Sequence, residues 1–246
     1  MTYCVGMLLN EGLAMIADTR TNAGVDNIST YKKLFVIEEP GERVIAIATA
    51  GNLSVTQTAL NRLKAGIKLP DSDHPETLMS APTLFRAAEL AGHAIKTVRS
   101  EFESGLEAQS VDMGATILLG GQIRGGELGL YLIYPEGNAI ACGADTPYLQ
   151  IGELKYGKPI LDRALQTGTP LVEALKLGLI SFDSTIRSNL GVGLPFDMIV
   201  VRPDTMKGTQ RRIEAGDPYF RELGQQWSDA ITAAYKAMPA PPWDNI

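Results

Sequence analysis

Thr2 is the residue of this chain whose type and position most directly suggest chemistry. Removal of an initiating methionine requires a small second residue, and threonine qualifies, so we expect the mature chain to begin at Thr2. Thr2 would then carry a hydroxyl and a free α-amine, whose ordinary pKa of about 7.7 to 8 leaves part of it neutral near pH 7. A neutral amine can accept the hydroxyl proton directly or through water, so one residue could be nucleophile and base. A threonine at position 2 also occurs in proteins with no such chemistry.

Asp18 is predicted to lie beside Thr2. Residues 2–9 and 13–18 are apolar and strand-like, and a short turn around Gly12 joins them. Because antiparallel pairing returns the end of the second strand to the start of the first, the hairpin places the carboxylate near the hydroxyl. The alternative is an ordinary aspartate at a strand end.

Lys33 is the second charged residue that we expect near the nucleophile. Alternation in the run YKKLFVI sends Lys33 and Phe35 to one face of a strand, and Lys32 and Leu34 to the other. A lysine that points between packed sheets needs a carboxylate partner, and Asp18 is available. Such a pair would lower the pKa of the hydroxyl and orient the amine. The alternative is a surface lysine doublet.

In the predicted strand at 43–50, one face from residue 46 onward carries only the methyl groups of Ala46, Ala48 and Ala50. Such a face allows close approach of another backbone. A substrate strand could lie against it, with the amide of Ala48 donating to an oxyanion. The alternative is a helix packed on the alanine face.

Composition excludes several classes of function. A net charge of −6 and a pI near 5.1 argue against nucleic acid or an anionic membrane as the main partner. Cys4 and Cys142 are too few for a disulfide framework, and His74 and His93 suggest neither a zinc cluster nor a Ser/His/Asp triad. We therefore expect no metal and no cofactor. Lacking a leader-like N-terminus and an apolar run of about 18 residues, the chain is expected to be cytoplasmic.

Strands and helices alternate in blocks along what we predict to be one domain, residues 1–246. Two antiparallel sheets that must each bury both faces are most simply stacked on one another, with helices outside. We therefore predict the α+β class and a four-layer αββα sandwich. Strands are predicted at 2–9, 13–18, 31–37, 43–50, 113–119, 128–134, 139–142, 196–202 and 210–214. Helices are predicted at 53–65, 84–102, 152–166 and 170–182, the last capped by Thr169, and from Pro218 onward, capped by Asp217.

The combined motifs resemble the proteasome β-subunit family of N-terminal nucleophile hydrolases, and in particular its bacterial members. The resemblance covers essentially the full chain and rests on the N-terminal threonine, the hairpin ending in ADTR, the strands KKLF and IATAG, and the later run ACGADTPYLQIGE. It implies the αββα fold and threonine-dependent amide hydrolysis. It assigns the nucleophile to Thr2, the acidic partner to Asp18, the lysine to Lys33, the oxyanion amide to Ala48, and further substrate contacts to Asn22 and Ala50.

The chain departs from the family pattern at its supporting residues. The serine that supports the terminal amine would fall in ACGADT, where Ala144 stands and Asp145 follows. The supporting aspartate and serine pair is predicted at Asp183 and Ser188, with an unusual spacing.

We expect a threonine-dependent peptidase that assembles into a homo-oligomeric ring or spiral. One alternative is a small-amide hydrolase or transacylase that uses the same Thr2. The other is a catalytically weak subunit whose role is self-assembly, which Ala144 would favour. The sequence identifies neither the natural substrate nor an unfoldase partner.

Overall fold

The structure, a computed structural model, describes residues 1–22, 28–105 and 112–242. It contains two five-stranded antiparallel sheets and a small two-stranded sheet. The first sheet has the order β10-β1-β2-β11-β12 and the second β5-β6-β7-β8-β9. The strands are β1 (Tyr3–Leu9), β2 (Gly12–Asp18), β3 (Arg20–Asn22), β4 (Ile28–Thr30), β5 (Leu34–Glu39), β6 (Arg43–Gly51), β7 (Ala115–Ile123), β8 (Gly129–Ile133), β9 (Ala139–Ala141), β10 (Tyr148–Gly152), β11 (Phe196–Val201) and β12 (Gly208–Ile213).

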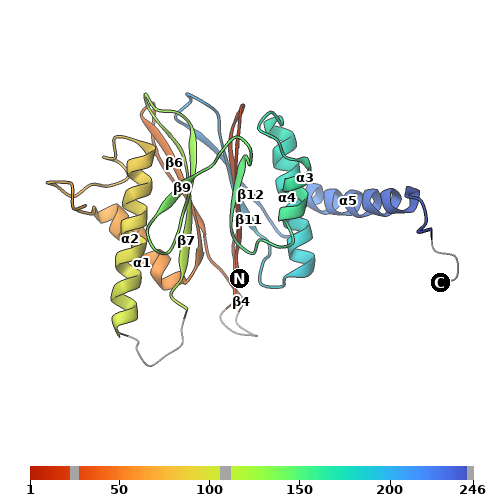
Figure 1. The fold of residues 1–246 in the computed structure, drawn as a ribbon, viewed down its shortest axis with the longest axis horizontal. Coiled ribbons are helices and arrows are strands. Elements are labelled where there is room, and N and C mark those ends of the chain that lie inside the picture. The colour runs from red at the N-terminus through yellow and green to blue at the C-terminus, as the bar shows by residue number, and fades with distance from the viewer. Residues whose placement is uncertain (23–27, 106–111, 243–246) are drawn as a thin grey trace.

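Helices cover the outer face of each sheet. Figure 1 shows α1 and α2 on one side of the paired sheets and α3 and α4 on the other, while α5 points away from the body. The four-layer αββα sandwich is therefore confirmed. No helix in the described ranges is long and apolar enough to cross a membrane. The helices are α1 (Leu53–Ala65), α2 (Leu84–Gly105), α3 (Lys158–Ala164), α4 (Leu171–Ser188) and α5 (Pro218–Ala237).

The alanine face of β6 lies between the two sheets. Ala46 and Ala48 are fully buried in a cluster with residues of the first sheet such as Leu13 and Met15, whereas Ile45 and Ile47 pack under α1 and α2. Both predicted neighbours of this face, a substrate strand and a packed helix, were wrong for Ala46 and Ala48, because the other sheet covers them. Small side chains here let the sheets approach closely.

Strand β10 is the main element that sequence patterning missed. The predicted helix at 152–166 begins only at Lys158, and the chain before it pairs with β1 from Met7↔Tyr148 to Tyr3↔Gly152. Gly152 has φ +86, a left-handed conformation that ends the strand. The run between Pro147 and Gly152 carries β-type residues bounded by turn residues, which is the signal that would have found it.

Several other predicted boundaries shift by a few residues, and two of the differences have a clear structural cause. Strand β7 continues through Gly120 and Gly121, because a Cβ at Gly121 would lie 2.0 Å from the Val44 carbonyl oxygen and only glycine allows this approach. Thr169 does not cap α4. The Leu171 amide instead donates to the carboxylate of Glu11, which lies in the β1–β2 turn, at 3.0 Å.

Candidate active site

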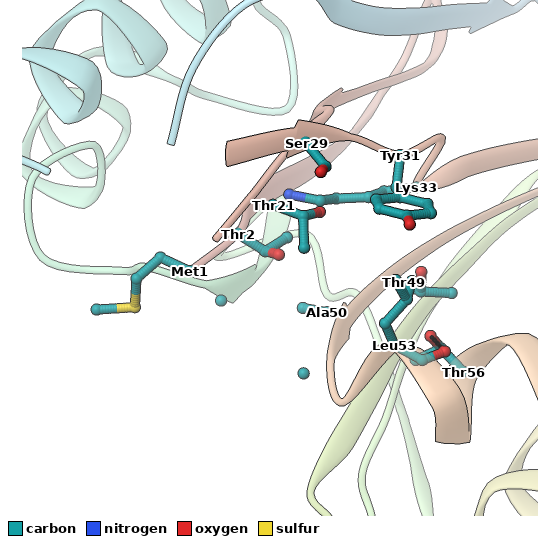
Figure 2. A pocket seen from close by; sticks show the side chains of 12 residues that line it. Met1, Thr2, Thr21, Ser29, Tyr31, Lys33, Thr49, Ala50, Leu53 and Thr56 are labelled. Atoms are coloured by element: carbon teal, nitrogen blue, oxygen red, sulfur yellow. Dashed lines mark hydrogen bonds between the residues drawn. The ribbon is translucent and has the colours of Figure 1, made fainter. Parts of the chain in front are cut away.

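A cavity of about 520 Å³ opens at the start of the chain, where strand ends of both sheets meet the start of α1. Figure 2 shows the hydroxyl-bearing side chains of Thr2, Thr21 and Ser29 gathered around the end of Lys33. The cavity is lined by Met1, Thr2, Thr21, Ser29, Tyr31, Lys33, Thr49, Ala50, Gly51, Leu53, Thr56 and Gly152.

Two hydrogen bonds hold the peptide group that joins Thr2 to Tyr3. Its carbonyl oxygen accepts from the Glu153 amide at 2.7 Å, and the next amide, Tyr3, donates to Asp18 Oδ1 at 3.0 Å. Thr2 is 9% exposed, whereas Met1 is 67% exposed. Thr2 is thus rigidly placed at the cavity wall while the residue before it projects into solvent.

Asp18 and Lys33 form a buried ion pair beside Thr2. Lys33 Nζ lies 2.7 Å from Asp18 Oδ1 and also donates to the Arg20 carbonyl at 2.5 Å. Burial raises the pKa of the Asp18 carboxyl, and the Lys33 ammonium and the Tyr3 amide oppose that shift. The hairpin register that pairs Cys4 with Ala17 brings Asp18 here, as the sequence predicts.

The alternation argument for Lys33 was wrong, although its partner is the predicted one. Lys33 precedes β5, so it does not share a strand face with Phe35. Leu34 packs between the sheets, and Phe35 packs on the helix side. Lys33 reaches Asp18 because the chain turns into β5 at the mouth of the cavity.

The amide of Ala48 does not face the cavity, which corrects the predicted oxyanion donor. On β6, Thr49 donates to the Lys33 carbonyl at 3.0 Å and Asn52 donates to Gly114 at 2.9 Å. Because amides alternate in direction along a strand, Ala48 belongs to the set directed at β7, opposite Leu118. Its N–H is used in the sheet.

The amide of Gly51 is directed to the cavity side of β6. It shares the direction of the Thr49 amide, but β5 has ended before it can supply a partner. Gly51 lines the cavity, and the turns and loops of the described residues supply no backbone acceptor to its N–H. Its φ of +99, with Gly114 oxygen 2.2 Å from where a Cβ would lie, requires glycine. This amide is available to an oxyanion.

The two other predicted substrate contacts are placed differently. Ala50 is 4% exposed and lines the cavity. Asn22 ends β3, and its side chain lies outside the described residues. Its neighbour Thr21 lines the cavity, with a buried Oγ1 that has no hydrogen-bond partner in the described part of the chain.

Ala144 and Asp145 lie at the opposite end of the first sheet from Thr2, which corrects the predicted position of the supporting residue. Strand β10 runs antiparallel to β1, and the Leu8 amide donates to Pro147 at 2.8 Å. The turn that contains Asp145 is therefore near the end of β1, while the other end of β10 reaches Thr2. Neither residue can contact the terminal amine.

Glu153 and Asn189 are two further residues at this site that the sequence prediction missed, in addition to Gly51 and Thr21. Glu153 is 7% exposed and directly follows β10. Its Oε2 accepts from Asn189 Nδ2 at 2.8 Å, and Asn189 directly follows α4. Both depend on which strand and helix ends meet in space, so no local pattern marks them.

Asp183 and Ser188 do not reach the cavity in the way that was predicted. Asp183 accepts from Arg187 Nε at 2.9 Å and packs against Gly224 of α5. Ser188 is exposed at the end of α4. Asn189, one residue later, donates to Glu153, whose amide donates to the Thr2 carbonyl. In the described ranges no cluster of three metal-ligating side chains is found.

Comparison with known proteins finds no matching family profile and no matching curated protein. Solved structures match over nearly the whole chain. An Anbu (Gly-1) mutant from Hyphomicrobium sp. strain MC1 is 45% identical with a TM-score of 0.89, over 100% of both chains. Anbu (ancestral beta-subunit) from Yersinia bercovieri is 42% identical with a TM-score of 0.88, over 98% of this chain and 100% of that one. A helical assembly of the Anbu complex from Pseudomonas aeruginosa matches with 42% identity and a TM-score of 0.89, over 98% of each chain.

Proposed function

The chain belongs to the Anbu family of proteasome-like proteins, and we propose that it is an N-terminal threonine hydrolase that cleaves amide bonds after Met1 has been removed. The observation that carries this proposal is the buried Asp18–Lys33 pair, whose carboxylate also holds the amide directly after Thr2 at 3.0 Å. A buried ion pair is expensive, so its position against a cavity wall calls for a functional reason.

The proposed reaction begins at the Thr2 hydroxyl. The neutral amine of Thr2 takes the proton as Oγ bonds to the substrate carbonyl carbon, and the carbonyl π electrons move to its oxygen. The Lys33 charge lowers the pKa of the hydroxyl, and the Gly51 amide, in place of Ala48, donates to the oxyanion. Collapse expels the leaving amine, which takes the proton from the Thr2 ammonium. Water then cleaves the ester in the same way and regenerates Thr2.

Peptides are the substrates that we propose first. A cavity of about 520 Å³ lies within the usual range for small-ligand sites, roughly 300–1,000 Å³, and fits one or two side chains at a time. The same size also suits a small amide, so hydrolysis or acyl transfer on small amides by Thr2 is the second candidate. A catalytically weak assembly subunit is the third.

We also propose that the chain forms a homo-oligomeric ring or spiral in the cytoplasm. The support is the similarity to the Anbu complex from Pseudomonas aeruginosa, whose structure is a helical assembly. The charge of −6 and the absence of a membrane-crossing helix in the described ranges accord with this setting.

The test uses an electrophile that needs both groups of Thr2. A peptide epoxyketone forms a ring by bonding its ketone carbon to Oγ and its epoxide carbon to the α-nitrogen, so the protein gains the full mass of the reagent. We expect this adduct, and peptide hydrolysis, in protein from which Met1 has been removed. Thr2→Ala and a Met1-retaining form should show neither. Equal hydrolysis by all three proteins would overturn the proposal.

A further inference from the structure

Glu153 lies directly beside the start of the chain. Its amide donates to the Thr2 carbonyl at 2.7 Å, and it is the first residue after β10. The preceding Gly152 permits this approach, because a Cβ there would lie 2.1 Å from the Thr2 carbonyl oxygen. The backbone of Thr2 and that of Glu153 are therefore locked together.

The Glu153 carboxylate is buried without a cation. It is in a residue that is 7% exposed, and its two oxygens accept from the Lys155 amide at 3.0 Å and from Asn189 Nδ2 at 2.8 Å. Within the described residues it forms no ion pair with a lysine, arginine or histidine. Buried carboxylates are normally paired with a positive charge, and each oxygen can accept a further hydrogen bond.

The turn after α4 lies next to the Glu153 carboxylate. Asn189 Oδ1 accepts from the Gly191 amide at 2.9 Å, which orients the side-chain amide toward Glu153. Met1 lies against Gly191, since a Cβ on that glycine would be 2.5 Å from Met1 Cβ. Removal of Met1 therefore creates a new ammonium group on Thr2, whose own carbonyl is bound by the Glu153 amide and whose preceding residue packs on this turn.

We propose that Glu153 is the counter-ion and positioning group of the Thr2 α-amine in the processed protein, an inference that rests on the proposed function. The carboxylate accepts an N–H of the amine and so fixes its rotation relative to the Thr2 hydroxyl. It also favours the charged form of the amine, which raises the pKa of that amine above the ordinary value. Glu153 thereby stabilises the ammonium that forms when the hydroxyl proton is transferred.

The other titratable groups around the amine do not replace Glu153. Asp18 and Lys33 pair with each other at 2.7 Å, so Asp18 already has a counter-ion and is not left as the counter-ion of the amine. Arg20 donates to the Leu190 carbonyl in the turn after α4 at 3.1 Å, and no ion pair between Arg20 and Glu153 is found among the described residues. Burial raises the pKa of the Tyr3 phenol and of the Cys4 thiol, so both are neutral near pH 7.

The test measures the pKa of the Thr2 amine without measuring catalysis. Full-length protein, shown by intact mass to lack Met1, is acylated with acetic anhydride across a pH series, and the acylated N-terminal peptide is quantified by mass spectrometry. We expect Glu153→Gln to lower the amine pKa by about one unit, which raises acylation near pH 7 about tenfold. Glu127→Gln, which removes an exposed charge in the β7–β8 turn, is the matched control and should leave the pKa unchanged.

Each outcome decides the inference. The same amine pKa in the unaltered protein and Glu153→Gln would overturn it, as would quantitative retention of Met1. If Glu153→Gln does not fold, Glu153→Asp, which withdraws the charge by one methylene, should lower the pKa by a smaller amount, and an unchanged value would overturn the inference. A pKa difference without hydrolysis would refute the proposed function alone, whereas hydrolysis with equal pKa values would refute this inference alone.

Discussion

Thr2 is restrained at its carbonyl and at the amide that follows it, but the proposed chemistry uses its hydroxyl and its nitrogen. The two restraints come from Glu153 and Asp18, at 2.7 and 3.0 Å. They hold the peptide group after Thr2 in place, and so they position the Cα that carries both the nitrogen and the hydroxyl-bearing side chain. Such positioning lowers the entropic cost of bringing the reacting groups to a substrate.

Lys33→Ala should abolish turnover while leaving the protein folded. The change removes the only side-chain cation paired with Asp18 in the described residues, and with it the field that acidifies the hydroxyl. We expect kcat to fall roughly 100-fold or more, by analogy with other preorganised electrostatic groups. Lys32→Ala, at the exposed neighbouring position, should keep its activity. Turnover and thermal unfolding of both variants check this, and full activity in Lys33→Ala would remove Lys33 from the mechanism.

The stability lost in Lys33→Ala should grow with pH. Burial already raises the pKa of Asp18, and loss of the ammonium that opposes this shift raises it further. A carboxyl with a raised folded-state pKa contributes stability below its unfolded pKa of about 3.9 and loses it as pH rises through the folded value.

Removing one partner of a buried pair costs about 3 to 5 kcal/mol, and less beside a wet cavity. The variant should therefore nearly match the unaltered protein at the lowest pH where both are folded, and fall behind it by pH 7.5. Urea unfolding across pH measures the difference, and a deficit independent of pH would contradict the prediction.

At the scale of elements, the site is assembled where several strand ends coincide. Strand β2 ends at Asp18, β6 ends at Gly51 and β10 ends at Gly152. Two of these ends are glycines with positive φ, so the backbone itself forms the cavity wall. A side chain at Gly152 would collide with the Thr2 carbonyl oxygen, and one at Gly51 would collide with the Gly114 carbonyl oxygen.

Gly152→Ala should disable the site by moving β10. A Cβ at this position would lie 2.1 Å from the Thr2 carbonyl oxygen, and its φ of +86 is strained for alanine. We expect the unfolding free energy to fall by about 1 to 3 kcal/mol, and turnover to fall with it because Thr2 and Glu153 separate. Gly143→Ala, where no atom lies within 4 Å, is the matched control. Equal turnover and melting temperature in the two variants would show that this contact is not required.

At the scale of the whole molecule, α5 is the helix that the sandwich leaves uncovered. Phe220 and Leu223 are buried against the body, but Ile231 and Tyr235, further along, are 47% and 60% exposed. Figure 1 shows the helix projecting outward. The apolar face of α2, by contrast, is buried on the β5–β9 sheet and is not free for a partner.

We expect the protein to be a homo-oligomer in which α5 contacts another copy. Exposed apolar side chains on a projecting helix are typical of an interface, so Ile231→Asp should reduce the oligomeric fraction with little change in melting temperature. Thr232→Asp adds the same charge at the next, exposed position and should assemble normally. Light scattering at micromolar concentrations measures the mass. A monomer in the unaltered protein would contradict the expected assembly, and equal masses of the variants would exclude Ile231 from the contact.

The sequence by itself determined the sandwich and the closeness of Thr2 to Asp18. Both follow from local rules: block-wise alternation of strands and helices requires two covered sheets, and a short hairpin forces its two ends together. It also identified Lys33 as the partner of Asp18, although for a reason of strand alternation that does not apply to a residue before β5.

Tertiary structure alone decided which groups face the cavity. The amide of Gly51 rather than Ala48 is directed there because hydrogen-bond direction depends on how β6 pairs with both neighbours. Glu153 and Asn189 come from a strand end and a helix end far along the chain, and no local pattern records that these ends meet at Thr2. Contacts between residues distant in sequence depend on how the sheets and helices are placed relative to one another, which is a property of the folded chain as a whole.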